Sequence, residues 1–258
     1  MVEWSSFIYF SSITVILWIV AIVLIYLNKS KALSTLFVIA GILVFMIFII
    51  GLWRWLGHPP FRTMGETRLW YSLFIMITGL VIYLKWKYKW LIAYSAIVST
   101  VFMIINIVKP ELHFTNLMPA LRSPWFIPHV SSYILSYSIL GAAFICGLMI
   151  VFSKKSDKNE LYILSDNLVA IGFGLLLAGM LMGALWAKEA WGDFWTWDPK
   201  ETWAFTTAVF YLVFIHLRRI TKTQNMAAYF LIISFILLLI TWLGVSYLPI
   251  AEGSMHTY

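Results

Sequence analysis

Eight apolar stretches occupy most of this sequence, and each is long enough, or nearly so, to cross a bilayer as a helix. They lie at residues 4–27, 33–56, 69–84, 90–108, 128–152, 167–187, 199–217 and 226–248. A helix needs about 20 residues to span the hydrocarbon core. Backbone polar groups find no water there, so spanning segments must satisfy them internally as helices. We therefore predict an all-α polytopic membrane protein with about eight transmembrane helices, forming a single integral membrane domain over residues 1–258.

The composition leads to the same class of protein. Hydrophobic residues make up 62% of the chain and charged residues only 11%, whereas about a quarter of an ordinary soluble domain is charged. The mean hydropathy is +0.89. The first apolar stretch begins close to residue 1, is too long for the apolar region of a signal peptide, and is not followed by a small-residue cleavage pattern. We expect it to be retained as a membrane span.

The distribution of basic residues predicts the orientation. Eleven of the eighteen Lys and Arg, with three acids, fall in the connections after the first, third, fifth and seventh stretches: Lys29, Lys31, Lys85, Lys87, Lys89, Lys154, Lys155, Lys158, Arg218, Arg219 and Lys222. Basic loops stay on the cytoplasmic side of a membrane. Both termini are then expected outside. The net charge of +7 is explained by topology, and no nucleic-acid partner is expected.

Several catalytic chemistries have no support in this sequence. Cys146 is the only cysteine and lies in the middle of an apolar stretch, so the chain cannot itself carry out dithiol–disulfide exchange. We find no phosphate-binding loop, dinucleotide fingerprint, Cys/His metal cluster or Ser–His–Asp arrangement. No residue is predicted to be catalytic.

A tryptophan-rich loop at residues 186–205, WAKEAWGDFWTWDPKETWAF, leads into the seventh stretch and is expected on the outer side. It holds five of the fourteen tryptophans. Interfacial belts explain scattered indoles, but not this concentration in one loop. Asp198, Pro199 and Glu201 also fit the N-cap, N1 and N3 positions of a capping box. We predict that this cap fixes the end of the loop while its rings form an apolar surface for a large planar cofactor.

The five histidines are divided by the predicted topology. His58, His113, His129 and His256 are expected on the outer side, and His216 is the only one near the inner side. Histidine near a membrane span is costly enough to suggest a functional site. Its neutral imidazole is a common axial ligand of haem iron.

The segment WGDFWTWDPKETWAF resembles the WWD motif of the haem-handling proteins of cytochrome c biogenesis. With its length, its eight spans and the segments GHPPFRTMGETRLW, PHVSSYILSYS, FIHLRR and GSMHTY, the chain most resembles the CcsA (ResC) family of the system II pathway. The CcmC family shares the loop and two outer histidines but usually has six spans, and is the alternative.

The resemblance implies a role for each motif residue. His129 and His256 would be the two axial ligands of haem b at an outer site, and Trp191, Trp195, Trp197 and Asp198 would hold the haem. His216 would belong to a second, inner haem site. His58 lies in a family motif, although its Gly-His-Pro-Pro context can equally shape a loop. His113 has no motif around it and is expected to be an ordinary loop residue.

The resemblance also implies a function. The protein would deliver or present haem at the extracytoplasmic face for covalent attachment to apocytochrome c, as part of a haem lyase or synthase complex. Its partners would be a CcsB/ResB-like membrane protein and a thioredoxin-like thiol reductant, in a bacterial plasma membrane or a thylakoid membrane. Because only one histidine is expected on the inner side, either a second inner ligand comes from another polypeptide, or the inner site does not exist and His216 is an interfacial residue beside Arg218 and Arg219.

Two other classes of function use some of the same features. A haem-free scaffold, or a transporter of amphipathic aromatic molecules, would use the apolar surface but would not need His129 or His256. A membrane cytochrome that transfers electrons would need paired histidines at matching depth, and only His216 is deep.

Overall fold

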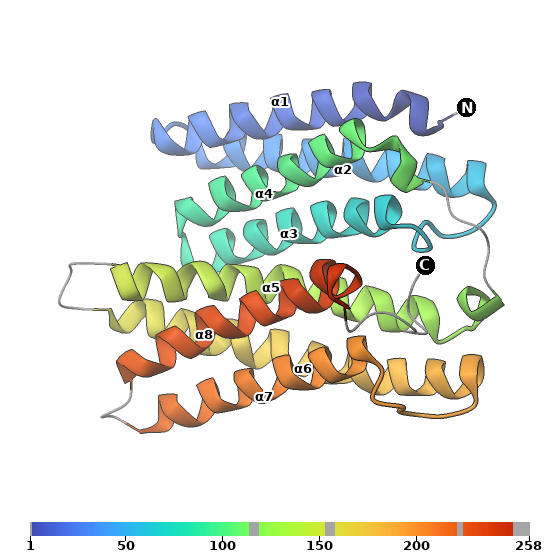
Figure 1. The fold of residues 1–258 in the computed structure, drawn as a ribbon. Coiled ribbons are helices and arrows are strands. Elements are labelled where there is room, and N and C mark those ends of the chain that lie inside the picture. The colour runs from blue at the N-terminus through green and yellow to red at the C-terminus, as the bar shows by residue number, and fades with distance from the viewer. Residues whose placement is uncertain (1, 114–118, 153–157, 221–223, 250–258) are drawn as a thin grey trace. The chain divides into compact units, whose positions relative to one another are not determined.

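The computed structural model describes residues 2–113, 119–152, 158–220 and 224–249, and every long element in these ranges is an α-helix (Figure 1). The chain forms two compact units, Met1–Leu117 and Met118–Tyr258. The first contains α1 (Phe7–Tyr26), α2 (Lys31–Leu56), α3 (Met64–Trp86) and α4 (Lys89–Val108). The second contains α5 (Phe126–Phe152), α6 (Asn159–Trp191), α7 (Pro199–Arg219) and α8 (Gln224–Leu239).

The predicted all-α polytopic class is confirmed. Among the described residues, seven helices are long and apolar enough to cross a membrane, the last of them running through α8 to Gly244. The remaining helix, α7, has 21 residues, which is long enough to span. It is less apolar because it begins with Lys200 and Glu201 and ends with Arg218 and Arg219.

Two helices, α3 and α6, begin well before their apolar stretches predict, whereas the starts of the others agree more closely. α3 starts at Met64 because Thr63 Oγ1 accepts the Glu66 N–H at 3.0 Å, while the Glu66 carboxylate accepts the Thr63 N–H at 3.3 Å. α6 starts at Asn159. Asp166, on the polar part of α6, forms a salt bridge of 2.7 Å with Arg218. Polar turns can continue a helix beyond the hydrocarbon core, so hydropathy alone underestimates the length of both helices.

In the first unit, α1 packs against α2 and α3 against α4 as antiparallel pairs. Trp18 of α1 is buried, and its Nε1 donates to the Val38 carbonyl of α2 at 3.3 Å. A Cβ on Gly41 would lie only 2.6 Å from Cδ1 of Trp18. The absence of a side chain at Gly41 therefore lets the indole fit between the two helices.

In the second unit, the backbones of α5 and α6 approach each other closely. Ser132 Oγ donates to the Leu175 carbonyl at 2.9 Å, and Ser136 Oγ donates to the Gly172 carbonyl at 2.6 Å. A Cβ on Gly172 would lie 2.7 Å from Leu140. Small residues and hydroxyl groups at such contacts are typical of helix pairs in membranes, where burial from water does not drive association.

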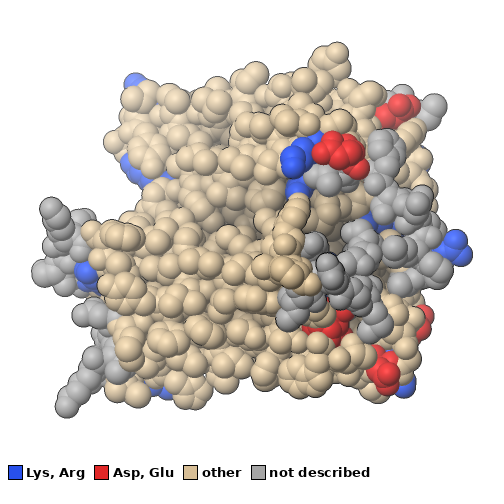
Figure 2. All heavy atoms as spheres, viewed as in Figure 1, with Lys and Arg blue, Asp and Glu red and all other residues tan. Residues whose placement is uncertain are grey.

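The helix surfaces are apolar where they would meet lipid. Four isoleucines of α1 are 47–59% exposed, namely Ile8, Ile13, Ile16 and Ile19, whereas Trp18 is 1% exposed. On the face shown in Figure 2, Lys, Arg, Asp and Glu lie near helix ends, and the surface between them carries none. This arrangement is typical of a multi-pass membrane protein.

Replacing Gly41 by alanine should destabilise the first unit by about 1–3 kcal/mol, because the new methyl group collides with Trp18. Trp18→Leu makes room for that methyl group, so the double variant should lose less stability than the two single variants added together. Thermal unfolding in detergent, followed by circular dichroism, measures all four proteins. Gly174→Ala is the control, since a Cβ there meets nothing within 4 Å. Strict additivity would contradict the proposed contact.

Candidate functional site

His129 lies in the first turns of α5, with its ring against α6. Its Nδ1 is 2.8 Å from the carbonyl oxygen of Gly179. The ring stacks on Trp186 at a centroid distance of 5.5 Å and meets Tyr133 edge-on at 4.7 Å. The side chain is half-buried. Contacts from both helices therefore fix the position of this imidazole.

The hydrogen bond to Gly179 also determines the tautomer of His129. A carbonyl oxygen can only accept, so Nδ1 must carry the proton and donate it. In the neutral ring, Nε2 then bears the lone pair that can coordinate a metal. Histidine ligands of metals are commonly oriented by such a bond to the other ring nitrogen. The tautomer of His129 is thus the one that iron ligation through Nε2 requires.

Gly183 provides the space for the His129 ring. A Cβ at Gly183 would lie 2.7 Å from both Cε1 and Nδ1 of His129. Real Cβ atoms are essentially never found so close to another side chain. A Cβ at Gly179 would likewise lie 2.6 Å from Tyr133. Neither glycine was predicted as part of the site. The recurrence of glycine at 172, 179 and 183 was the available signal in the sequence.

The start of the tryptophan-rich loop is connected to His129 through aromatic contacts. Trp186, which is 1% exposed, contacts both His129 and Trp191. Its ring centroid lies 4.7 Å from that of Trp191, and the two ring planes are inclined at 66°. α6 ends at Trp191, and Gly192 follows in the left-handed conformation with φ 94°. The predicted site residue Trp191 is thus joined to His129 by Trp186, which was not among the predicted ligand-holding residues.

The other two predicted tryptophans contact each other and Phe205. Trp195 meets Trp197 edge-on at 5.8 Å, and Trp197 meets Phe205 of α7 in the same way. Trp197 is 62% exposed and has φ 60°, a conformation that is unusual for a bulky residue. Within the described part of the chain, the buried Nε1 of Trp195 has no hydrogen-bond partner. Such strain and exposure are typical of binding loops.

The predicted capping box at the start of α7 is confirmed. Asp198 Oδ1 accepts the Lys200 N–H at 2.9 Å, and Pro199 occupies the first helical turn. Glu201 Oε2 accepts the Asp198 N–H at 3.2 Å and also the Thr196 N–H at 2.8 Å. The Glu201 carboxylate therefore holds the backbone on both sides of Trp197. Asp198 is 7% exposed, and its bond to the Lys200 N–H shapes the end of the loop.

A further contact joins the start of α5 to the end of α6. Ser123 Oγ donates to Glu189 Oε2 at 2.6 Å and accepts the Trp125 N–H at 3.2 Å. The His129 N–H in turn donates to the Trp125 carbonyl at 3.0 Å. This chain of bonds couples the histidine's helix to the tryptophan-rich loop, and nothing in the sequence pattern indicated it.

His216 lies near the opposite end of α7. Helical rise over the seventeen residues from Pro199 places it about 26 Å along the axis from the start of α7. Its side chain is exposed, and its Nδ1 is 2.8 Å from the Leu212 carbonyl oxygen. As at His129, the proton is on Nδ1. His216 and His129 cannot bind one iron. His256 lies outside the described residues.

The histidines of the first unit have local contacts that shape loops. His58 Nδ1 is 3.0 Å from the Pro59 carbonyl oxygen, and Trp70 closes the same loop by donating to the Pro60 carbonyl at 2.7 Å. His113 is 8% exposed and stacks on Trp4 at 3.7 Å. Burial lowers the pKa of His113 below its ordinary value. Among the described residues, no three His, Cys, Asp or Glu side chains converge as a metal site.

Comparison with known proteins identifies the family. A sequence family described as "Cytochrome C assembly protein" matches residues 61–251, which include both His129 and the tryptophan-rich loop. The cytochrome c biogenesis protein CcsA of Chlamydomonas reinhardtii is 31% identical over 248 residues, covering 89% of this chain and 69% of that protein. CcsA of Prochlorococcus marinus (strain AS9601) is 29% identical over 269 residues, covering 89% of this chain and 86% of that protein. The chain belongs to the CcsA family of cytochrome c assembly proteins.

A solved structure shares the fold of this CcsA-family chain. A protein named cytochrome c heme lyase CcmF superposes with a TM-score of 0.61 at 16% identity. The match covers 97% of this chain and 48% of CcmF, so this chain spans about half the length of that protein. At this identity the likeness concerns the fold alone. Family membership assigns the CcsA-family chain to cytochrome c biogenesis, which confirms the predicted process.

Glu201→Ala should loosen the tryptophan-rich loop of this CcsA-family protein without unfolding α7. It removes the acceptor of the Thr196 and Asp198 amides, and each unmade buried bond costs about 1–3 kcal/mol. Hydrogen exchange over residues 193–198 should then be about tenfold faster per 1.4 kcal/mol lost. Glu201→Gln retains one acceptor oxygen and should keep most of the protection. Equal protection in wild type and Glu201→Ala would show that other contacts hold the loop.

Proposed function

We propose that this protein holds haem beside the tryptophan-rich loop and presents it to apocytochrome c for covalent attachment. The observation that carries the proposal is the imidazole of His129. Its Nδ1 proton is held by the Gly179 carbonyl, so Nε2 has the lone pair needed for iron, and its ring is one contact from Trp186 at the base of the loop. Haem is the cargo of this site.

The chemistry of the described residues fits haem. Haem offers the two large apolar faces of its porphyrin, an iron that accepts an axial imidazole, and polar propionates at one edge. Three aromatic rings of the loop region are well exposed, namely Phe194 at 53%, Trp197 at 62% and Phe205 at 46%. The buried Nε1 of Trp195, which has no hydrogen-bond partner among the described residues, can donate to a polar group of a ligand. Flat apolar contact of this kind contributes about 1–3 kcal/mol per buried ring.

The contribution of this chain is binding and orientation. With His129 on one side of the iron and, by family resemblance, His256 on the other, both axial positions would be filled and oxygen would be kept from an open site. The Cys-x-x-Cys-His thiols of apocytochrome c supply the bond-forming chemistry, since each S–H adds across a vinyl group to give a thioether. Cys146 is fully buried in α5 and takes no part. A separate thioredoxin-like reductant would keep the client thiols reduced.

The orientation follows from the basic loops. The connections between α1 and α2, α3 and α4, α5 and α6, and α7 and α8 carry most of the Lys and Arg and would face the cytoplasm. The tryptophan-rich loop connects α6 to α7 and would therefore face the extracytoplasmic side, where cytochromes c are assembled.

The second haem site of this proposal involves His216. Its exposed ring, with the proton on Nδ1, presents a lone pair at the surface of α7. Since it is far along α7 from the loop, a second imidazole for the same iron would come from another polypeptide, such as a CcsB/ResB-like membrane protein.

His129→Ala should greatly reduce the haem retained after purification, and Gly183→Ala should reduce it about tenfold, as expected when the orientation of a ligand is lost. The alanine methyl group at 183 would displace the His129 ring. The measurement is the Soret absorbance per protein for the full-length chain in detergent. Gly174→Ala, on the same helix, is the matched control and should keep wild-type haem.

Each outcome separates the proposal from its rivals. A haem-free scaffold or transporter predicts no Soret band in the wild type. Full haem with an unchanged spectrum in His129→Ala would exclude this residue as the axial ligand. Haem binding without formation of covalent cytochrome c in a reconstituted strain would favour an electron-transfer cytochrome.

Co-expression with a CcsB/ResB-like partner should add a second haem that depends on His216. The chain alone is expected to bind haem only beside the tryptophan-rich loop, so His216→Ala should change the ratio of haem to protein only in the complex. Arg219→Gln, at the same end of α7, is the control. An unchanged ratio on adding the partner would leave His216 as an interfacial residue.

A further inference from the structure

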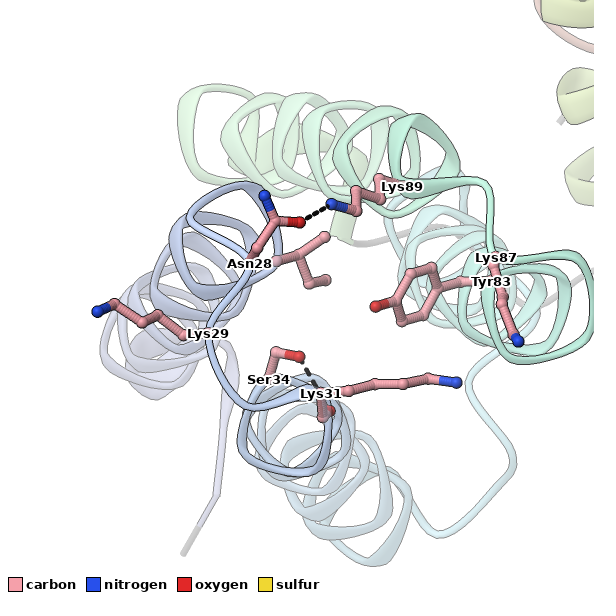
Figure 3. Close-up of a pocket in the computed structure, with 8 residues that line it drawn as sticks. Asn28, Lys29, Lys31, Ser34, Tyr83, Lys87 and Lys89 are labelled. Atoms are coloured by element: carbon pink, nitrogen blue, oxygen red, sulfur yellow. Dashed lines mark hydrogen bonds between the residues drawn. The ribbon is translucent and has the colours of Figure 1, made fainter.

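A basic cavity lies at one end of the first unit, where α1 and α3 end and α2 and α4 begin (Figure 3). Its volume is about 250 Å³. Its lining includes Lys29, Lys31, Lys87 and Lys89 together with Tyr83, and it has no acidic member. We infer that this cavity binds the phosphate group of an anionic phospholipid.

The first argument is the direction of the side chains. In Figure 3 the Tyr83 hydroxyl points into the cavity, and Lys31 extends from α2 toward Tyr83 and Lys87. Lys89 is hydrogen-bonded to the neutral side chain of Asn28. Lys29, by contrast, points away from the other residues. Ammonium groups that share one cavity repel each other, and an anion between them removes that repulsion.

The second argument is the distribution of acids. Residues 1–117 contain three, Glu3, Glu66 and Glu111, which lie before α1, in the first turn of α3 and after α4. All three are therefore at the opposite helix ends from the cavity. No carboxylate of the first unit therefore lies beside these lysines, and an anionic ligand could supply the compensating charge.

The third argument comes from the backbone. Among the described residues, three that are not glycine have a positive φ, and two of them, Asn28 at 51° and Lys87 at 61°, line this cavity. Lys87 ends α3 in the left-handed position that glycine normally occupies. α4 begins beside it without a side-chain cap, so the amides of its first turn add positive potential.

The size and surroundings favour a lipid over a free anion. The cavity is large enough to accommodate a phosphodiester group. Ile25 forms part of the wall, and Tyr26, Leu27 and Leu84 next to the cavity are 44–62% exposed. Acyl chains could lie along these apolar side chains while the phosphate enters the cavity. Basic pockets between helices on the cytoplasmic side of membranes bind lipid headgroups in this way.

The positive-inside rule offers a simpler account of lysines at this end, since it requires no binding site. The two accounts differ in what they expect of individual lysines. A general preference for the cytoplasmic side depends on the total charge, whereas a site depends on Lys31 and Lys87 specifically. The two accounts can therefore be separated by variants with equal charge.

The test uses the full-length protein, delipidated in detergent and titrated with phosphatidylglycerol, phosphatidylcholine or inorganic phosphate. Phosphatidylglycerol should raise the Tm by about 4 °C in a saturable manner, and the other two probes should not. Lys31→Gln/Lys87→Gln should weaken the response to phosphatidylglycerol roughly tenfold or more. Lys85→Gln/Arg219→Gln removes the same charge from two basic residues that do not line the cavity and should respond as wild type.

Each alternative result overturns the inference. An equal response to phosphatidylcholine, or an equal loss in the control double variant, would leave only a general charge effect. A response to inorganic phosphate that matches the lipid would reassign the cavity to a soluble anion. If Lys31→Gln/Lys87→Gln does not fold, Tyr83→Phe provides the test without a charge change. Its hydroxyl donor is lost, so its affinity for phosphatidylglycerol should fall, and an unchanged affinity would exclude Tyr83 and the cavity.

Discussion

The close approach of α5 to α6 is the constraint on which the candidate haem site depends. His129, Ser132 and Ser136 lie along one face of α5, and each donates to a carbonyl of α6, at Gly179, Leu175 and Gly172. These bonds are possible because Gly172, Gly179 and Gly183 carry no side chain where α5 packs. The interaction that holds the two helices together in lipid is therefore the same one that sets the tautomer of the histidine. A change that separated the helices would damage the fold and the site together.

The tryptophan-rich loop combines a rigid attachment with exposed rings. Gly192 ends α6, and the Asp198 and Glu201 carboxylates fix the backbone before α7. Between these anchors Trp197 is held with a positive φ and most of its ring exposed. A loop without a ligand would gain stability by burying that ring or relaxing that backbone. The strain and exposure are understandable if the loop is built to meet a flat apolar molecule.

Much of the fold could be predicted from the sequence, because lipid imposes a simple rule on helix length and polarity. The same rule could not place the ends of α3 and α6, where polar caps and an ion pair extend the helices beyond the apolar stretches. At the site, the capping box was readable from the sequence pattern, and the motif around His129 singled that residue out as a candidate ligand. The contacts with Gly179, Gly183 and Trp186 were not readable, because they depend on which faces of α5 and α6 meet. Within the part of the chain that the structure describes, Trp191 contacts Trp186 while Trp195 contacts Trp197, and residue spacing in a loop does not reveal these pairings.

The histidines show why a motif and a hydrogen bond are not sufficient to identify a ligand. A ring nitrogen interacts with backbone in His58, His113, His129 and His216 alike. What differs is how far each histidine side chain is exposed. His113 is 8% exposed and packed flat on Trp4, with its pKa lowered by burial, so it serves the packing of the first unit. His129 is half-buried at the base of an aromatic loop, and His216 is exposed on α7. Both described histidines of the second unit have the proton on Nδ1, so Nε2 is the ring nitrogen that could ligate iron in each, and His216 lies about 26 Å along α7 from Pro199 by helical rise.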